Sequence, residues 1–200
     1  MNPTGIAREV LAAAPGALVV ASLGTPTSAL RAASDDGPHL YLGGSMGVAV
    51  AAALGVAEKR PERAVIALLG DGEAVMGAGS FWSLAGIAPA NLLAVVLVDG
   101  HYTITGGQPL AVPDTFGDVA AALGLPTATA RTYAEVGAGV RDLPRPAVLE
   151  VRYDERDWPG PSPFVDPPVV RRRFEQAATA RAGSDGSRAR HRPARPCRSR

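Results

Sequence analysis

The sequence of 200 residues holds a single cysteine, Cys197, and lysine occurs once, as Lys59. One thiol excludes an intramolecular disulfide framework and a cysteine-based metal site. Aromatic residues make up only 5% of the chain, so alanine, valine and leucine must build the core. The longest apolar run, Val48 to Ala57, is too short to cross a bilayer, and the first residues lack the charged-then-apolar order of a signal peptide. We therefore expect a soluble, cytoplasmic protein with no membrane partner.

Charge is nearly balanced overall but is unevenly distributed. The formal net charge is +1, which gives no general attraction to nucleic acid, and no nucleic-acid partner is expected. From Arg181 onward the chain is rich in arginine, serine and proline and has no apolar periodicity. We expect residues 183–200 to form a disordered basic tail, residues 159–182 a proline-rich link with a possible final helix, and residues 1–158 the folded domain.

Apolar runs bounded by glycine and proline alternate with alanine-rich segments of helical length. This order is typical of an α/β protein with a doubly wound, mostly parallel sheet and helices on both faces. Residues 101–114 are polar and are expected to form a long loop. The expected strands are 17–22, 39–42, 63–69, 91–98, 127–130 and 147–152, and the expected helices are 3–14, 25–33, 48–58, 74–88, 116–123, 133–141 and 169–182.

Two of the expected strands, 63–69 and 91–98, end close to a carboxylate beside glycine, Asp71 and Asp99. Continuous apolar runs of this length are typical of parallel strands covered on both faces. If the two strands are neighbours, both carboxylates lie at the carboxyl edge of the sheet, where open α/β sheets bind ligands. Two carboxylates suit Mg²⁺, which proteins usually bind with one or two carboxylates together with substrate phosphates. The pattern predicts a metal that anchors a diphosphate.

The glycine-bearing loops do not match the common nucleotide-binding motifs. The string G-x-x-x-x-G-K-[ST] is absent, and G-x-G-x-x-G fails because Val75 stands at the third position after Gly70 and Gly72. What remains is a strand, a glycine turn and a helix start, a geometry that offers main-chain N–H groups to an anion. The segments 44–47 and 72–74 both have this pattern.

The string Gly70-Asp71-Gly72, followed by Asp99 about one strand–helix unit later, resembles the diphosphate-binding domain of thiamine diphosphate-dependent enzymes. Further segments resemble, in the same order, the small subunit of sulfopyruvate decarboxylase and the C-terminal part of phosphonopyruvate decarboxylase. These segments are 18–27, 40–47 and 96–108. The resemblance extends over residues 3–152.

The resemblance implies a site for Mg²⁺. Asp71 would be a side-chain ligand, Asp99 a second one, and His101 would contribute its main-chain carbonyl. Asp99 departs from the family pattern, which usually has asparagine there. An aspartate keeps the oxygen ligand but adds a negative charge beside an anionic diphosphate, so the departure bears on how the metal binds.

The resemblance also implies a set of residues that bind thiamine diphosphate. The carbonyl of Gly44 would accept a hydrogen bond from the aminopyrimidine, and Met46 would hold the two rings of the cofactor in a bent form. Glu73 would favour a helix dipole but would repel a diphosphate unless its side chain is turned away. The full set is Gly44, Ser45, Met46, Gly70, Gly72, Glu73, Ala74, Tyr102 and Thr105.

His101 is the candidate catalytic residue, because it would lie next to the metal loop and histidine titrates near neutrality. The alternative is an ordinary histidine of a surface loop. Two interpretations also remain for the neighbouring residues Tyr102, Thr105 and Gln108. They would either line the channel for cofactor or substrate or contribute to the packing of the loop.

His39 is interpreted as a structural residue. Phe81 and Trp82 are interpreted as residues of the core or of a subunit interface, and with the apolar helix expected over 74–88 they are candidates for the contact with a partner.

Enzymes of this class need a glutamate from a pyrimidine-binding domain, and one α/β domain accounts for this chain. The resemblance therefore implies a subunit of a split carbon–carbon lyase, a hetero-oligomer with a pyrimidine-binding partner. Its substrate would be a small 2-oxo acid similar to sulfopyruvate or phosphonopyruvate, and its products an aldehyde and carbon dioxide. Two alternatives remain: a subunit of an acetolactate synthase-like carboligase, and a non-catalytic subunit that retains the fold.

Overall fold

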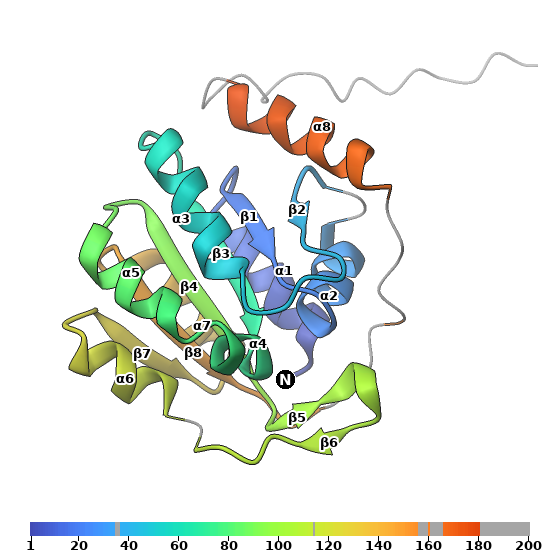
Figure 1. Cartoon of the computed structure of the whole chain (residues 1–200), viewed down its shortest axis with the longest axis vertical. Helices are drawn as coiled ribbons and strands as arrows, with labels where there is room; N and C mark the ends of the chain where they lie inside the picture. The colour runs from blue at the N-terminus through green and yellow to red at the C-terminus, as the bar shows by residue number, and fades with distance from the viewer. Residues whose placement is uncertain (35–36, 114, 156–159, 161–165, 181–200) are drawn as a thin grey trace, which may run out of the picture.

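The structure is a computed structural model that describes residues 1–34, 37–113, 115–155, 160 and 166–180. Its centre is a six-stranded sheet whose strand pairs are all parallel, with the order β2-β1-β3-β4-β8-β7 (Figure 1). The strands are β1 (Leu18–Ala21), β2 (Leu40–Tyr41), β3 (Val65–Gly70), β4 (Leu92–Val98), β7 (Thr127–Ala130) and β8 (Ala147–Arg152). The expected α/β fold with a doubly wound parallel sheet is confirmed.

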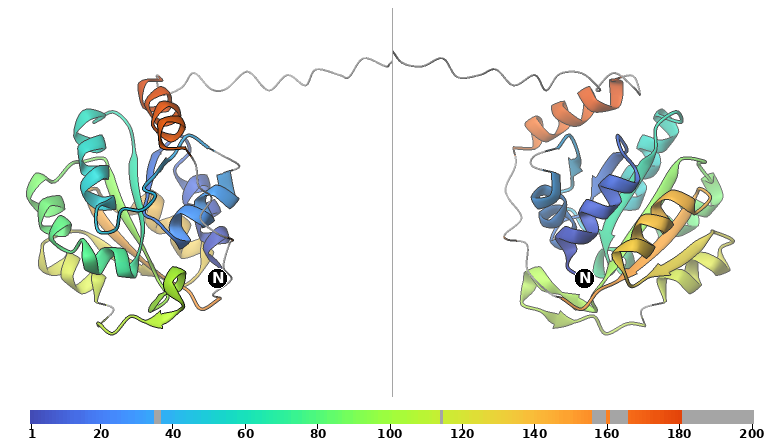
Figure 2. Two further views of the ribbon diagram at one scale, coloured as in Figure 1. Left: turned by 45° about the vertical axis from the view of Figure 1, so that its right-hand side comes forward. Right: turned by 180° about the vertical axis from the view of Figure 1, so that it is seen from behind.

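Helices cover both faces of this sheet (Figure 2). One face packs against α3 (Ala49–Lys59), α5 (Gly79–Ile87), α6 (Phe116–Ala122) and α8 (Pro167–Thr179). The other face packs against α1 (Pro3–Ala13), α2 (Thr25–Ser34) and α7 (Tyr133–Asp142). No helix in the described part of the chain combines the length and the apolar character needed to span a membrane.

The two central strands, β3 and β4, are the most deeply buried part of the fold. All seven residues of β4 are buried, as are the first five of β3, because helices cover them on both sides. Apolar side chains of this size contribute about 1.5–3 kcal/mol each on full burial. The sheet is therefore rigid beneath the point where the two strands end.

The strand order reverses at β1, because the chain passes from β1 outward to β2 and then returns to form β3 on the other side of β1. In open α/β sheets, ligands bind beyond the carboxyl ends of the strands at such a reversal. The segments that follow β1, β3 and β4 meet at this edge.

Two expected elements differ from the structure. The helix expected over 74–88 begins earlier and is interrupted, forming α4 (Asp71–Met76) and α5. The interruption falls at Gly77, where a Cβ would lie 2.4 Å from the carbonyl oxygen of Gly47, so the chain bends where the two backbones touch. The expected loop over 101–114 contains an antiparallel hairpin, β5 (His101–Tyr102) and β6 (Gln108–Pro109), with a 3₁₀ turn at Thr103–Thr105.

The domain limits at residues 158 and 182 and the basic tail remain predictions. Residues 156–159, 161–165 and 181–200 lie outside the described residues. The final helix, expected over 169–182, is α8 in the part that the structure describes. Its Phe174 packs into the same core as α3.

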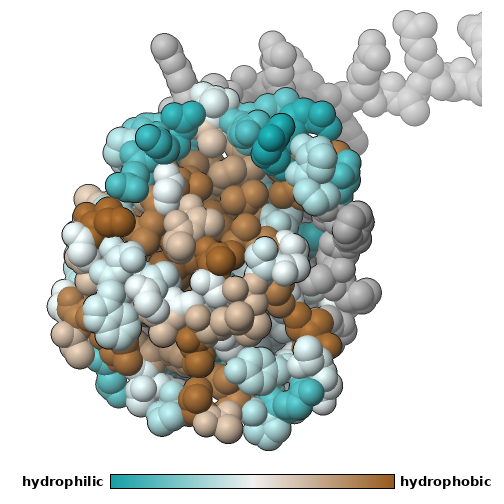
Figure 3. Space-filling view, in the orientation of Figure 1, coloured by the Kyte–Doolittle hydropathy of each residue, from teal (hydrophilic) through white to brown (hydrophobic). Residues whose placement is uncertain are grey.

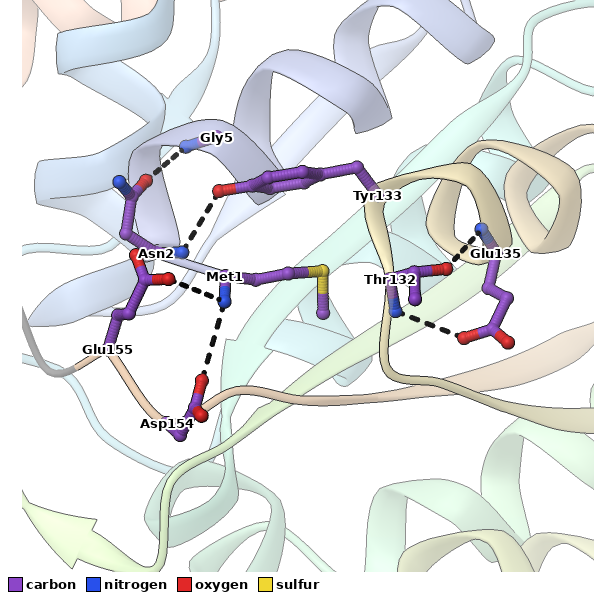
Figure 4. Close-up of polar contacts among 8 residues, drawn as sticks. All are labelled: Met1, Asn2, Gly5, Thr132, Tyr133, Glu135, Asp154 and Glu155. Atoms are coloured by element: carbon purple, nitrogen blue, oxygen red, sulfur yellow. Dashed lines mark hydrogen bonds and ion pairs between the residues drawn. The ribbon is translucent and has the colours of Figure 1, made fainter.

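The first residues of the chain are attached to the end of β8 and the start of α7 (Figure 4). The amino group of Met1 lies 3.4 Å from Asp154 and 3.1 Å from Glu155. The N–H of Asn2 donates to the hydroxyl of Tyr133 at 3.0 Å, while the Asn2 side chain caps α1 by accepting from Gly5 N at 2.8 Å. These contacts place α1 against α7.

His39 is a buried residue at the start of β2, consistent with its interpretation as structural. Its ring meets the ring of Tyr41 edge-on at 6.2 Å between centroids, and in the described structure its Nδ1 has no hydrogen-bond partner. Burial without a partner disfavours the charged form and lowers the pKa of His39 to about 4.

We expect the free energy of unfolding to rise with pH between about 4 and 6.5 because of His39. In that interval the unfolded chain binds a proton that the folded chain does not, which favours unfolding by up to about 3 kcal/mol at the acid end. Replacement His39→Phe removes this dependence. Urea denaturation at several pH values measures the free energy of unfolding of both proteins. If this free energy changes equally with pH between about 4 and 6.5 in the two proteins, the assignment to His39 is wrong.

Candidate functional site

A cavity of about 110 Å³ lies at the carboxyl edge of the sheet, where β1, β3 and β4 end. Segments that follow each of these strands line it, together with Met46 and Tyr153. Both predicted metal ligands, Asp71 and Asp99, belong to this lining, and so do His101 and Tyr102. The structure thus brings together residues from five separate parts of the sequence.

Asp71 joins the ends of β3 and β4. One carboxylate oxygen, Oδ2, accepts hydrogen bonds from the main-chain N–H groups of Gly100 at 2.7 Å and Asp99 at 3.1 Å. The other, Oδ1, accepts from Gly72 N at 2.7 Å. The side chain is 3% exposed, so these main-chain donors replace water around a buried carboxylate.

The environment of Asp71 opposes its ionisation. Burial is the main cause that raises the pKa of this carboxyl group, and the negative charge of Asp99 raises it further. The N–H groups of Gly100, Gly72 and Asp99 act in the opposite direction. A cation between the two aspartates would favour the ionised form of Asp71.

Asp99 is held by three donors from the chain that follows β4 and β8. Its Oδ1 accepts from His101 N at 3.0 Å, and its Oδ2 accepts from the hydroxyls of Tyr153 at 3.1 Å and Thr103 at 3.2 Å. His101 is half-buried, and its Nδ1 lies 2.8 Å from the main-chain oxygen of Asp99. The histidine ring is therefore oriented by the same turn that carries the second carboxylate.

The donor set fits a hard cation, provided that main-chain or ligand oxygens complete it. The carboxylate of Asp71 has about four lone-pair sites, of which the hydrogen bonds described above use three, and Mg²⁺ favours oxygen ligands. Among the residues that the structure describes, no three His, Cys, Asp or Glu side chains gather as a metal cluster. Two aspartates alone would leave most of an octahedral shell to other oxygens.

The loop between β2 and α3 carries three of the predicted cofactor-binding residues. Met46 reaches the cavity, whereas Gly44 and Ser45 are exposed and do not line it. Gly47, at the end of this loop, has a φ of +85°, a left-handed conformation that favours glycine. The side chain of Ala74 is buried in the hydrophobic core, and Ala74 follows the lining residue Glu73 without itself lining the cavity.

Glu73 is turned toward this loop. Its carboxylate accepts from the N–H groups of Gly47 at 2.6 Å and of Val48 and Ala49 at 2.9 Å. Val48 and Ala49 stand at the start of α3, where the first N–H groups have no partner within the helix. A negative charge at this position interacts favourably with the helix dipole. The charge that would repel a diphosphate is thus compensated by α3.

Tyr102 and Met46 both contact Gly72. A Cβ on Gly72 would lie 2.5 Å from Cε1 of Tyr102 and 3.3 Å from Cε of Met46. On the same hairpin, Ile104 lies against Gly24, where a Cβ would approach its Cδ1 to 2.8 Å. The hairpin therefore packs closely on the turns that follow β1 and β3.

Thr105 lines the cavity, but its side-chain hydrogen bonds stay within the hairpin, to Gln108 and to the carbonyl of Tyr102. Sequence reasoning missed Tyr153, Thr103 and the segment 22–26 as parts of the site. The sequence predicts a strand that ends at residue 22 and a turn over 24–27 that opens a helix, and the place of this segment after the strand is the available signal. Tyr153 carries no local motif, because only strand pairing between β4 and β8 brings it to Asp99.

The family model for the thiamine pyrophosphate enzyme, C-terminal TPP binding domain, matches residues 26–151. The chain belongs to this family. Thiamine pyrophosphate is another name for thiamine diphosphate. The matched region contains the glycine loop, both aspartates and the hairpin, and so most of the cavity lining, whereas the lining residues 22–25 and Tyr153 lie outside it.

Several known proteins of this kind resemble the chain. Phosphonopyruvate decarboxylase of Streptomyces hygroscopicus is 37% identical over 186 residues, covering 88% of this chain and 46% of the relative. Sulfopyruvate decarboxylase subunit beta of Methanothermobacter thermautotrophicus is 40% identical over 91 residues, covering 46% of this chain and 49% of the relative. The chain spans about half the length of these curated relatives.

A solved structure shows the same architecture. The thiamine diphosphate-dependent 4-hydroxybenzoylformate decarboxylase of Rhodococcus jostii RHA1 superposes with a TM-score of 0.62 at 25% sequence identity. The match covers 78% of this chain and 33% of that one. The fold of the TPP-binding domain is therefore shared with a longer enzyme.

The contact between Gly72 and Tyr102 generates a prediction for stability. Replacement Gly72→Ala is expected to destabilise the protein by about 1–3 kcal/mol, because the new methyl group overlaps the tyrosine ring. The second replacement Tyr102→Ala removes that overlap, so the double variant should be less destabilised than the sum of the single ones. Urea denaturation of the four proteins tests this. Strict additivity would mean that the ring does not press on Gly72.

The charge of Asp99 generates a second prediction. Replacement Asp99→Asn removes a negative charge next to Asp71, so the pKa of the Asp71 carboxyl group is expected to fall. Carboxyl ¹³C NMR titration measures this pKa directly. Replacement Asp118→Asn, on the exposed side of α6, serves as the control and should leave the pKa of Asp71 unchanged. An unchanged pKa after Asp99→Asn would refute the electrostatic coupling.

Proposed function

We propose that this chain is the thiamine diphosphate- and Mg²⁺-binding subunit of a split 2-oxo acid decarboxylase. Its substrate would be a compound similar to sulfopyruvate or phosphonopyruvate, and its products an aldehyde and carbon dioxide. The observation that carries the proposal is the cavity in which Asp71 and Asp99 meet the glycine turn and Met46, in a chain of the TPP-binding family.

The metal would be bound by the carboxylates of Asp71 and Asp99 and by the carbonyl of His101. The fit rests on two buried or half-buried carboxylates that lie at one edge of the sheet, where burial and then the charge of Asp99 raise the pKa of Asp71. A divalent cation offsets this repulsion, and diphosphate oxygens would supply the ligands that the protein lacks.

The cofactor would extend from Asp71 to the loop between β2 and α3. The main chain at Gly72, Glu73 and Ala74 would bind the diphosphate, and Met46 would support the rings. When bound, thiamine diphosphate supplies the electron sink that the loss of carbon dioxide requires. The residues of this chain would orient the cofactor and exclude water. The ring of His101, beside the turn that carries Asp99, would move a proton during the reaction.

A partner subunit would supply the activating glutamate. The chain spans about half of its phosphonopyruvate decarboxylase relatives, and other relatives are named as beta subunits of sulfopyruvate decarboxylase. No charged residue occurs between Ala74 and Ala90, and Met76 and Trp82 in this stretch are 66% and 58% exposed. Apolar groups gather over α3 and α5 on the face seen in Figure 3. This face would contact the partner, whereas Phe81 is buried in the core.

The proposal predicts activity that depends on both chains and on the metal. The chain, co-purified with a pyrimidine-binding chain from a neighbouring reading frame, should release carbon dioxide from 3-sulfo- or 3-phosphonopyruvate with Mg²⁺ and thiamine diphosphate. Removal of the metal with EDTA should abolish turnover, and Asp71→Asn should lower it by about 100-fold or more, since a charged ligand is lost. A coupled aldehyde assay and gas-phase detection of carbon dioxide measure the products.

Replacement Asp99→Asn is the matched variant, because it keeps an oxygen ligand and removes only the charge. Cofactor binding should be retained or improved, and its loss would show that Asp99 has another role. A hydroxyketone as the main product would favour the carboligase alternative. Absence of turnover across a panel of 2-oxo acids would contradict the decarboxylase proposal.

A further inference from the structure

The strongest unassigned feature of the chain is the buried carboxylate of Glu73. The side chain is 5% exposed, and its two oxygens accept from three consecutive main-chain N–H groups, those of Gly47, Val48 and Ala49. A buried carboxylate is costly unless it is fully hydrogen-bonded. Here the donors come from another element, 25 positions away from Glu73 in the case of Val48.

Helix α3 depends on this carboxylate for its start. Its own N-cap residue, Val48, makes no side-chain capping hydrogen bond, and valine has no acceptor with which to make one. The first N–H groups of a helix lack partners within it. Glu73 of α4 therefore supplies the cap that the local sequence omits.

A second contact fixes the same loop independently. Gly47 and Gly77 meet backbone to backbone, since a Cβ on Gly77 would lie 2.4 Å from the oxygen of Gly47 and one on Gly47 would lie 3.3 Å from Gly77 N. No side chain fits between them. The loop thus rests on both ends of α4, through Glu73 at one end and Gly77 at the other.

We infer that Glu73 is a positioning residue that sets the conformation of the loop 43–47 and, through it, the place of Met46 beside Gly72. This inference rests on the proposed function, because it assigns the loop to cofactor binding. Glu73 acts through the main chain of the loop, and its own carboxylate is occupied by α3. The glycine turn after β3 and the loop after β2 are thereby built as one unit.

The chain contains a matched control in Glu150. This residue of β8 is also buried, at 2% exposure, and it caps α6 by accepting from Gly117 N at 3.1 Å. The N-cap residue of α6, Thr115, likewise makes no side-chain capping bond. Glu150 does not line the cavity, so it provides the same kind of helix cap away from the site.

Hydrogen exchange of the full chain, without cofactor, tests the local role. Replacement Glu73→Gln keeps the shape but leaves one acceptor oxygen, so at least one N–H loses its acceptor. Exchange at residues 47–49 should rise about tenfold or more, while exchange at residues 116–119 is unchanged. Replacement Glu150→Ala removes the acceptor of Gly117 N and should give the opposite pattern. Equal increases in both segments for both variants would mean global destabilisation and would overturn the inference.

Calorimetric titration with Mg²⁺ and thiamine diphosphate, in the presence of the partner chain, tests the consequence for the site. Affinity should fall about tenfold for Glu73→Gln and further for Glu73→Ala, because the amide restores part of the cap. Glu150→Gln should change it by less than about twofold, since distant sites act independently. Full affinity in Glu73→Ala would overturn the inference. If the unaltered protein binds no cofactor, the proposed function fails, and hydrogen exchange still decides the role of Glu73.

Discussion

The buried carboxylate of Asp71 is the interaction on which the arrangement of the site depends. It accepts main-chain N–H groups from the turn after β4 and from its own turn after β3, so it fixes the two strand ends relative to each other. The turn after β4 carries Asp99 and leads into the hairpin, and Asp71 is also the first residue of α4. Any change that displaces Asp71 is therefore transmitted to both walls of the cavity.

Buried acids in this fold are compensated by main-chain N–H groups more than by cations. Asp71 and Glu73 each accept three such hydrogen bonds, and Glu150 combines one with an ion pair to Arg152 at 2.5 Å. Oriented N–H groups stabilise a charge without a flexible side chain. The surroundings of the three carboxylates at the site differ in their electrostatics. Glu73 interacts favourably with the dipole of α3, whereas Asp71 and Asp99 repel each other. A cation would therefore be stabilised more strongly by Asp71 and Asp99 than by Glu73.

The sequence predicted the fold and the neighbouring strands well, because these depend on patterns that repeat along the chain. Apolar runs that end in glycine and aspartate predicted β3 and β4, and the loop after β2 was recognised from Gly44 to Gly47. The break at Gly77, the hairpin after β4 and the cap from Glu73 were not predictable in this way. Each arises from a contact between distant segments, such as the approach of Gly77 to the carbonyl of Gly47.

Asp99 bears on whether the site is intact, since an added carboxylate beside Asp71 is unfavourable in isolation. The structure surrounds it with a main-chain N–H from His101 and hydroxyls from Thr103 and Tyr153. Hydrogen bonds to a carboxylate offset part of the repulsion between neighbouring negative charges. The donors around Asp99 thus hold its carboxylate at the cavity wall beside Asp71, which is the arrangement that the proposed metal site uses.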